Sequence, residues 1–369
     1  MMRRKVLYLV QCFSACVVGL TGCASDRRLP PLRPDPQSTV RRVADFVLKD
    51  FPQTPPFDWG EGVLMAGMIR AGTATGDARY VDFVRRWADH WHQHGIEPIL
   101  NDRGYCGHWG PGFALLMLYE QTREQTYLDM TRTIVEFMQD QATRTTDGGL
   151  GHWRGNRQIW VDTLYMSCPL YANFGRLTGK PDLILEAALQ LDISRRHLQD
   201  APTGLFYHMY DEPTGRPTCE PWGRGNGWTA MAYVETLRNL DRRSPEYGQL
   251  AAAFRRLAAG LIASQDAQSG LWHTVLTRPE SYLETSASAM ILYSLIEGHR
   301  LGVIRLADMQ IIVRGWQGLS AKVDAEGRVV DVSAGTGPTN YETYARIPRG
   351  TYTWGTGAFL IAASALAKP

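Results

Sequence analysis

The chain has 369 residues, a formal net charge of +2 and 44% hydrophobic residues, which are enough apolar side chains to bury a large core. A nearly neutral chain offers no electrostatic basis for binding nucleic acid or for holding a long polyanion along many contacts. Any acidic ligand must therefore be recognised locally.

The first residues predict an exported lipoprotein. Basic residues at positions 3–5 precede a short apolar run that ends near residue 20, which is too short to span a membrane and is typical of a signal peptide. The run closes with the motif LTGC, in which Cys23 would be lipidated and become the mature N-terminus. An ordinary secretory signal is the alternative.

We therefore expect a signal peptide over residues 1–22 and a proline-rich tether over 23–40. The lipid on Cys23 would anchor the protein to a bacterial membrane, at the periplasm or the cell surface. Removal of the signal peptide also removes its three cations, which changes the formal charge from +2 to −1.

Three cysteines follow Cys23, namely Cys106, Cys168 and Cys219. None belongs to a CxxC motif or a Cys/His array, so neither a disulfide framework nor zinc is indicated, and buried thiols are the expected state. The sequence also has no Gly-rich phosphate loop with Lys-Ser/Thr, no HExxH motif and no Gly-x-Ser-x-Gly elbow. We predict no metal and no cofactor, and the sequence carries no signal for an oligomeric state.

Residues 41–369 predict one repetitive all-α domain. Almost every long segment with apolar periodicity is helical, and the segments form pairs. The predicted pairs are 41–50 with 61–74, 78–93 with 111–122, 126–141 with 160–177, 181–198 with 225–239, 245–264 with 284–298, and 304–318 with 354–368.

The connections indicate how the pairs are arranged. Links from one pair to the next are short and polar, such as TGDARY over 75–80, which is typical of antiparallel neighbours. Links inside a pair are longer and lead into second helices full of small residues, which suit an inner ring. Six pairs then make an (α/α)6 barrel whose long loops gather at one end as the ligand site. A superhelical solenoid is the alternative, but no terminal repeat resembles a polar cap.

Asp162 is the first candidate for chemistry. It stands near the start of a predicted inner helix, beside Trp160 and Tyr165 in otherwise apolar surroundings. Desolvation raises the pKa of a carboxyl in such surroundings, so Asp162 can stay protonated and act as a general acid. The structural alternative is a residue that caps the helix or complements its dipole.

Two neighbouring segments offer binding groups. In the motif WGRGNGW over 222–228, the planar guanidinium of Arg224 can bind a carboxylate through two parallel hydrogen bonds. The two tryptophans offer flat faces to a sugar ring. A tight turn with an exposed Arg is the plainer interpretation. The alternating segment GLFYHMYD over 204–211 suggests a short strand or loop that presents His208 to a pocket, although a lone His is often structural.

Glu284 begins an inner helix much as Asp162 does. It is either a second acid or a partner that orders the nearby serines and backbone amides, and we favour the structural role.

Together these segments resemble the unsaturated glucuronyl and rhamnogalacturonyl hydrolases of glycoside hydrolase families 88 and 105. The resemblance covers roughly residues 59–368. Its specific parts are WVDTLYM over 160–166, GLFYH over 204–208, WGRGNGW over 222–228, and GLWH over 270–273 with YLETS over 282–286.

The resemblance implies a glycoside hydrolase with an (α/α)6 barrel that acts on an oligosaccharide with a terminal unsaturated uronic acid. The enzyme protonates the enol ether at C4 and adds water at C5, and the hemiketal then opens and releases the neighbouring sugar. Asp162 takes the role of acid toward C4 and then of base toward the water. The residues that correspond to the sugar-binding set are His208, Trp222, Arg224 and Trp228, with His152 as a further match, and Arg224 or the glycine amides beside it would hold the uronate carboxylate.

One departure bears on the substrate. These families carry a second Asp on the inner helix that starts here around 106–112, where this chain has none and His108 occupies the neighbourhood. His108 would substitute in part as a substrate-binding group. Alternatively, the enzyme would act on saturated glucuronides by two-carboxyl chemistry, with Glu61 or Glu284 as the second group.

Two non-enzymatic readings of the same chain remain. A carbohydrate-binding lipoprotein without catalysis would have kept the pocket, but retention of Asp162 beside Trp160 disfavours it. An inert interaction scaffold explains the helices but not the Trp, Arg and His residues gathered at one end.

Overall fold

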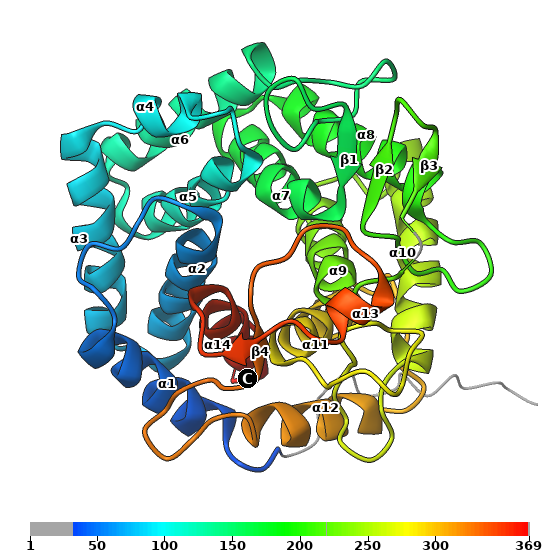
Figure 1. The fold of residues 1–369 in the computed structure, drawn as a ribbon. Coiled ribbons are helices and arrows are strands. Elements are labelled where there is room, and N and C mark those ends of the chain that lie inside the picture. The colour runs from blue at the N-terminus through cyan, green and yellow to red at the C-terminus, as the bar shows by residue number, and fades with distance from the viewer. Residues whose placement is uncertain (1–31, 219, 368–369) are drawn as a thin grey trace, which may run out of the picture.

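The computed structural model describes residues 32–218 and 220–367, and within them twelve helices of eleven or more residues form two concentric rings (Figure 1). The outer ring consists of α1 (Pro36–Asp50), α3 (Ala78–His94), α6 (Gln125–Asp140), α8 (Pro181–Leu198), α10 (Pro245–Ala263) and α12 (Gln310–Ser320). The inner ring consists of α2 (Trp59–Thr75), α5 (Pro111–Thr122), α7 (Val161–Thr178), α9 (Gly223–Leu237), α11 (Thr285–Arg300) and α14 (Thr353–Leu366). The predicted (α/α)6 barrel is confirmed.

The ring closes where the first inner helix meets the last. Helices α2 and α14 pack along their length, at positions without side chains. A Cβ atom on Gly357 would lie 2.4 Å from the carbonyl oxygen of Val63, and one on Gly67 would lie 2.6 Å from that of Gly357. The solenoid alternative is wrong, because these glycines allow backbones from opposite ends of the chain to touch.

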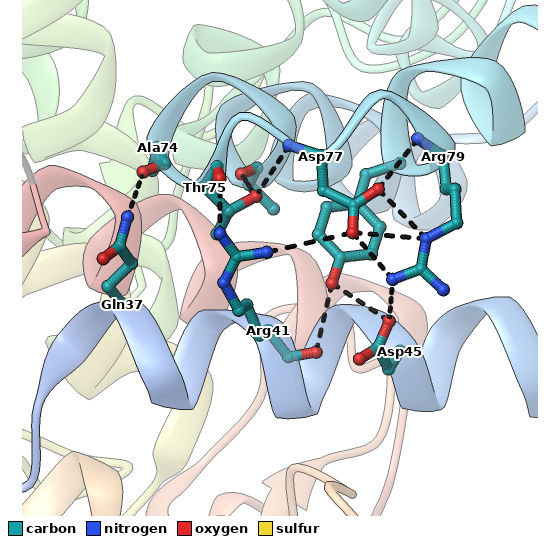
Figure 2. A network of polar contacts seen from close by, with 9 residues as sticks. Gln37, Arg41, Asp45, Ala74, Thr75, Asp77 and Arg79 are labelled. Atoms are coloured by element: carbon teal, nitrogen blue, oxygen red, sulfur yellow. Dashed lines mark hydrogen bonds and ion pairs between the residues drawn. The ribbon is translucent and has the colours of Figure 1, made fainter.

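On the outside, a polar network joins α1 to the turn between α2 and α3 (Figure 2). Asp77 accepts a hydrogen bond from the backbone N–H of Arg79 and so caps α3. The Arg79 side chain pairs with Asp77 and with Asp45 on α1, while Arg41 donates to the carbonyl of Thr75. Exposed ion pairs of this kind contribute little individually, so this network fixes the position of α1 more than it stabilises the whole fold.

Short elements occupy the end at which the inner helices begin. They are α4 (Glu97–Asn101), the 3-10 helix η1 (Cys106–Trp109), α13 (Tyr341–Tyr344), the three-stranded antiparallel sheet β1 (Gln158–Trp160), β2 (Met209–Asp211), β3 (Arg216–Pro217), and the antiparallel pair β4 (Val332–Ser333) and β5 (Arg349–Gly350). The segment between β4 and α13 crosses the centre of the inner ring at this end (Figure 1, orange).

The β1–β2 pairing brings distant parts of the chain together. Trp160 is opposite Met209 in the register, and the backbone N–H of Val161 donates to the carbonyl of His208 at 3.1 Å. The pairing therefore places the first turn of α7 beside the residue that precedes β2.

Several sequence predictions concern the ends and the thiols. Helix α1 begins at Pro36 with Asp35 as its N-cap, so the folded part begins inside the tether that was expected to reach residue 40. Cys106 and Cys168 are buried free thiols, as predicted. The signal peptide, the lipidation site Cys23 and the third thiol, Cys219, lie outside the described residues. Among the residues that are described, no helix is both long and apolar enough to cross a membrane.

Candidate active site

A cavity of about 470 Å³ opens at the end of the barrel where the inner helices begin, within the range of roughly 300–1,000 Å³ that is typical of ligand pockets. Its wall combines aromatic rings with a few charged groups from six parts of the chain. The lining residues are Asp58, Trp59, Arg103, Tyr105, Cys106, Gly107, His152, Trp153, Trp160, Asp162, Met166, Trp222, Arg224 and the segment 335–337. Flat indole faces beside polar groups suit a sugar ring.

Asp162 is held from behind by a chain of hydrogen bonds. Its side chain is 19% exposed, and its Oδ2 lies 3.0 Å from Nε2 of His208, which is fully buried. Because a carboxylate only accepts, Nε2–H donates to Asp162, and in the neutral ring Nδ1 accepts from the Tyr344 hydroxyl at 2.6 Å. The backbone N–H of Thr339 donates in turn to the Tyr344 oxygen. The chain fixes both the position of the carboxylate and the tautomer of the histidine.

The expectation that desolvation keeps Asp162 protonated is wrong. Burial acts to raise its pKa, but the hydrogen bond from His208 and the nearby positive charge outweigh burial, so the pKa lies below its ordinary value. Nor does its side chain cap α7, whose N-cap is Trp160 without a side-chain bond. Asp162 is therefore an ionised carboxylate at neutral pH, which is the state of a base.

His152 lies on the cavity as predicted, in a neutral state. It stacks on Trp160 with ring centroids 3.9 Å apart, and its Nδ1 lies 3.2 Å from Sγ of Cys106 and 3.1 Å from Oγ1 of Thr163. Burial lowers the pKa of His152 to about 4. This neutral ring supports Trp160, whose indole forms part of the cavity wall.

Arg224 reaches the cavity, and three of its five N–H donors are engaged there. Nη1 donates to the carbonyl and the hydroxyl of Ser333 at 2.8 and 2.6 Å, and Nη2 donates to the carbonyl of Ala334 at 2.9 Å. The guanidinium also lies over the ring of Trp222. Arg224 spends these three donors on holding Ser333 and Ala334, whereas its Nε–H has no partner within the described residues, so binding of a uronate carboxylate by Arg224 stays a prediction.

Two members of the predicted sugar-binding set lie behind the wall. Trp228 is fully buried, stacks on Tyr165 and meets the edge of Trp59, so it supports a lining residue without lining the cavity itself. His208 is covered by Trp222, with ring centroids 4.3 Å apart. Neither residue lines the cavity, because a sequence motif shows the residue type and not its depth, and direct sugar contact by either one stays a prediction.

The two acids proposed for two-carboxyl chemistry also lie off the cavity. Glu284 is fully buried, caps α11 and accepts bonds from Ser286, from the backbone of Ala287 and from the backbone of Ser333. Its favoured structural role is confirmed. Glu61 lies in the first turn of α2, where it accepts a hydrogen bond from the hydroxyl of Thr353. It does not line the cavity.

Asp58 is the second carboxyl on the cavity, and it is not among the residues that the sequence motifs single out. It is the N-cap of α2, and its Oδ1 accepts from the backbone N–H of Trp59 at 2.8 Å. His108 lies close enough for the two groups to interact electrostatically, but it does not line the cavity. The signal was available, since an Asp before a Trp-Gly start of an inner helix is an N-cap pattern. No three His, Cys, Asp or Glu residues in 32–218 or 220–367 come together as a metal site.

Comparisons with known proteins agree with this architecture. Residues 36–368 match the sequence profile of Glycosyl Hydrolase Family 88. The unsaturated rhamnogalacturonyl hydrolase YesR of Bacillus subtilis (strain 168) is 30% identical over 334 residues, which are 88% of this chain and 94% of that protein. An unsaturated 3S-rhamnoglycuronyl hydrolase of Alteromonas sp. (strain LOR) is 24% identical over 83% of this chain and 76% of that protein. A solved structure described as a possible member of the GH105 family, from Salmonella enterica serovar Paratyphi A, has a TM-score of 0.81 and 25% identity over 92% of this chain and 96% of its own.

Proposed function

The chain belongs to glycosyl hydrolase family 88, and we propose that its cavity binds the unsaturated uronic acid at the non-reducing end of a lyase-generated oligosaccharide and releases the neighbouring sugar. The observation that carries the proposal is the Asp162 carboxyl, hydrogen-bonded to His208, on a cavity lined by indole rings. Such a site can bind a sugar face by stacking and act on a water molecule beside it.

The state of Asp162 decides its role. An acid that protonates C4 must hold a proton at the working pH. Burial alone would raise the pKa of Asp162, but the hydrogen bond from His208 brings it below its ordinary value. This state supports the second of the two roles predicted for Asp162, in which it removes a proton from the water that adds at C5, and its role as the acid toward C4 stays a prediction.

The test uses the ultraviolet absorbance of the enol ether. The purified protein should remove the absorbance of a lyase-generated unsaturated disaccharide, and Asp162→Asn should lower kcat by about 100- to 10,000-fold, the usual range for a general base. Asn is nearly isosteric and still accepts a hydrogen bond, so the fold should survive. If the enol-ether absorbance of every unsaturated uronide persists in the presence of the protein, the proposal is wrong.

A second candidate is hydrolysis of saturated glucuronides. Asp58 and Asp162 both line the cavity, and ordinary glycosidases use a pair of carboxyl groups. Release of a chromophore from a saturated aryl glucuronide, without loss of absorbance from any unsaturated substrate, would select this function. A carbohydrate-binding role without catalysis would give binding and no turnover of either substrate.

The names of the relatives suggest the parent polysaccharide. The protein of Bacillus subtilis is named for rhamnogalacturonyl substrates, and that of Alteromonas for 3S-rhamnoglycuronyl substrates. Both names pair an unsaturated uronic acid with rhamnose, so we propose rhamnose in the next subsite. A panel of unsaturated disaccharides with rhamnose or glucose in that place, compared by kcat/KM, tests this choice.

The lipid anchor rests on the N-terminal sequence. The motif LTGC that ends at Cys23 supports lipidation and attachment to a bacterial membrane. In a bacterial host fed a labelled fatty acid, the full-length protein should carry label and partition with detergent. Cys23→Ser should carry none, and a labelled Cys23→Ser variant would contradict the proposal.

A further inference from the structure

The burial of the lining residues gives the cavity an inner end and a mouth. Asp162 lies toward the inner end, whereas four lining residues at the mouth are exposed, namely Arg103, Trp153, Gly335 and Gly337. Glycine has no side chain, so only Arg103 and Trp153 can offer side-chain contacts there. An oligosaccharide whose terminal sugar reaches Asp162 has to leave through this mouth, where its next sugar meets these two residues.

Trp153 presents a flat apolar surface to water at the mouth. At 37% exposure it is the most exposed of the eleven tryptophans. Its ring meets the ring of Trp160 at 65°, with centroids 5.3 Å apart, and the ring of His152 at 71°. Covering apolar surface is favourable, and an indole held at an angle to the inner wall suits a sugar that follows the terminal one.

The backbone on both sides of Trp153 is fixed. The backbone N–H of Arg154 donates to the carbonyl of Arg103 at 2.7 Å, and that of Cys106 donates to the carbonyl of His152 at 2.9 Å. These bonds join residues 102–106 to residues 152–154, and the two segments together are called the mouth ledge here. A ligand that binds to a ledge already held in place pays little ordering entropy.

Arg103 belongs to a left-handed turn in the mouth ledge. Its φ is 52°, a conformation that is uncommon for a residue with a side chain, and Gly104 follows with a φ of 55°. A Cβ atom on Gly104 would lie 3.3 Å from Cβ of Arg154, so this turn packs closely against the other segment. Uncommon backbone conformations of this kind cluster at functional sites. From this turn Arg103 lines the cavity.

The charge of Arg103 is available to a ligand. Two arginines line the cavity, and Arg224 already donates to Ser333 and Ala334. The Arg103 side chain is 80% exposed, and Asp102 is its ion-pair partner within the described chain, with Nε and Oδ1 4.0 Å apart. An exposed pair at this distance contributes little. The planar guanidinium can therefore exchange it for two parallel hydrogen bonds to an anionic ligand group.

We propose that the mouth ledge binds the sugar next to the terminal uronic acid, with Trp153 stacked on its ring and Arg103 paired with an anionic group of the leaving oligosaccharide. The inference rests on the proposed function and adds the charge of the leaving part to it. Carboxylates and sulfate esters both suit the guanidinium. A sulfate ester would belong to the neighbouring sugar, whereas a carboxylate would belong to a uronic acid one sugar further out.

The role of Trp153 is tested with two neutral leaving groups. The unsaturated uronic acid is supplied as its methyl glycoside and as a disaccharide with rhamnose, and loss of the enol-ether absorbance gives kcat/KM for each. Methanol is too small to reach the mouth ledge. Trp153→Ala should therefore lower kcat/KM for the disaccharide about 3- to 10-fold more than for the methyl glycoside, the effect of losing one aromatic stack. Trp153→Phe should recover part of this loss.

The role of Arg103 is tested with charged and uncharged leaving groups. The disaccharide is compared with its sulfated form, and a trisaccharide that ends in a uronic acid is compared with one that ends in a neutral sugar. For the wild type we expect a preference of about 10-fold for a charged member, the effect of one hydrogen bond between charged groups. The preference should shrink in about 1 M salt, which screens exposed charges beyond about 3 Å.

Arg103→Asn should abolish this preference, because Asn tolerates the left-handed turn but carries no charge. The matched control is Arg123→Asn. Arg123 also has a positive φ, of 61°, but it lies at the C-cap of α5 and does not line the cavity. This variant should keep the wild-type preference.

The outcomes separate this proposal from the proposed function. If Trp153→Ala slows the methyl glycoside as much as the disaccharide, Trp153 only supports Trp160 and the mouth ledge binds no sugar. If the wild type prefers no charged substrate, or Arg103→Asn keeps the preference, no anion binds at Arg103. A preference for the sulfated disaccharide places the anion on the neighbouring sugar, and a preference for the acidic trisaccharide alone places it one sugar further out. If the wild type consumes no unsaturated uronide, including the methyl glycoside, the proposed function is wrong and this inference falls with it.

Discussion

The His208 side chain links the buried interior to the carboxylate on the cavity, which makes its contribution measurable by pH. Replacement by Phe keeps an aromatic ring against Trp222 and removes the hydrogen bond to Asp162. Burial would then be opposed only by the remaining positive charge, and the pKa of Asp162 should rise, so the acidic limb of the kcat/KM profile should move to higher pH. At acidic pH the rate should fall about 10- to 100-fold, because a hydrogen bond to a charged group contributes about 1.5–3 kcal/mol.

Tyr344→Phe is the milder companion of this variant. It removes the hydroxyl that bonds to Nδ1 of His208 and leaves the bond to Asp162 in place, so a smaller displacement of the same limb is expected. An equal loss of rate at every pH, with the limb unmoved, would show that His208 only packs.

The buried His152 should make the free energy of unfolding depend on pH. Burial lowers its pKa to about 4, whereas an unfolded histidine titrates near 6.5. Between these values the unfolded chain binds a proton that the folded chain refuses, so the protein should lose up to about 3 kcal/mol as the pH falls from 6.5 to about 4. Urea unfolding at several pH values should show this loss in the wild type and not in His152→Phe, which keeps the stack on Trp160. Parallel pH dependences would contradict it.

The sequence could identify some site residues but not their depth. Asp162, Trp222 and Arg224 lie in sequence motifs, His152 is a further match, and all four reach the cavity. Asp58 escapes sequence-based prediction because the apolar periodicity places the start of the helix at residue 61, which leaves the true N-cap in a loop. The segment 335–337 was missed because only the fold brings it across the ring, and no local pattern predicts that contact.

At the scale of elements, Arg224 controls the segment that crosses the cavity. Arg224→Lys keeps the charge, but a single ammonium nitrogen cannot reach all the acceptors on Ser333 and Ala334 that Nη1 and Nη2 reach separately. We expect faster amide exchange over 333–340 and KM raised about 10-fold, the effect of losing one hydrogen bond to a charged group. Arg349→Lys, on β5 and half-exposed, is the control and should change neither. Unchanged exchange in Arg224→Lys would show that the segment is held by other contacts.

The long helices were predictable because each has to bury one face over several turns. The predicted pairs agree with the twelve long helices to within a few residues at most ends, and α12 begins later than expected, at Gln310. The elements α4, α13 and β3 were not predicted, since they are too short to show a period of their own. They form around the ends of the barrel helices and depend on tertiary contacts.

For the whole molecule, closure of the ring is the feature that a single substitution can test. Gly357→Ala places a Cβ atom 2.4 Å from the carbonyl oxygen of Val63 and 2.6 Å from the backbone nitrogen of Leu64, so α2 and α14 must separate. Overpacking of this kind costs about 1–3 kcal/mol. In a closed ring, no neighbouring repeat can absorb the shift by sliding, because both helices are held from the other side by α5 and α11. We therefore expect one cooperative unfolding transition that moves to lower urea concentration.

The matched control for closure is Gly248→Ala. Gly248 is exposed in α10, and a Cβ atom there would meet nothing within 4 Å. The same substitution should raise the free energy of unfolding by about 0.5–1 kcal/mol, because Ala loses less backbone entropy than Gly in a helix. Opposite signs for the two variants would locate the effect in the α2–α14 contact and exclude a general response to Ala. If Gly357→Ala unfolds like the wild type, the ring can open at this contact without loss, and closure does not hold the barrel together.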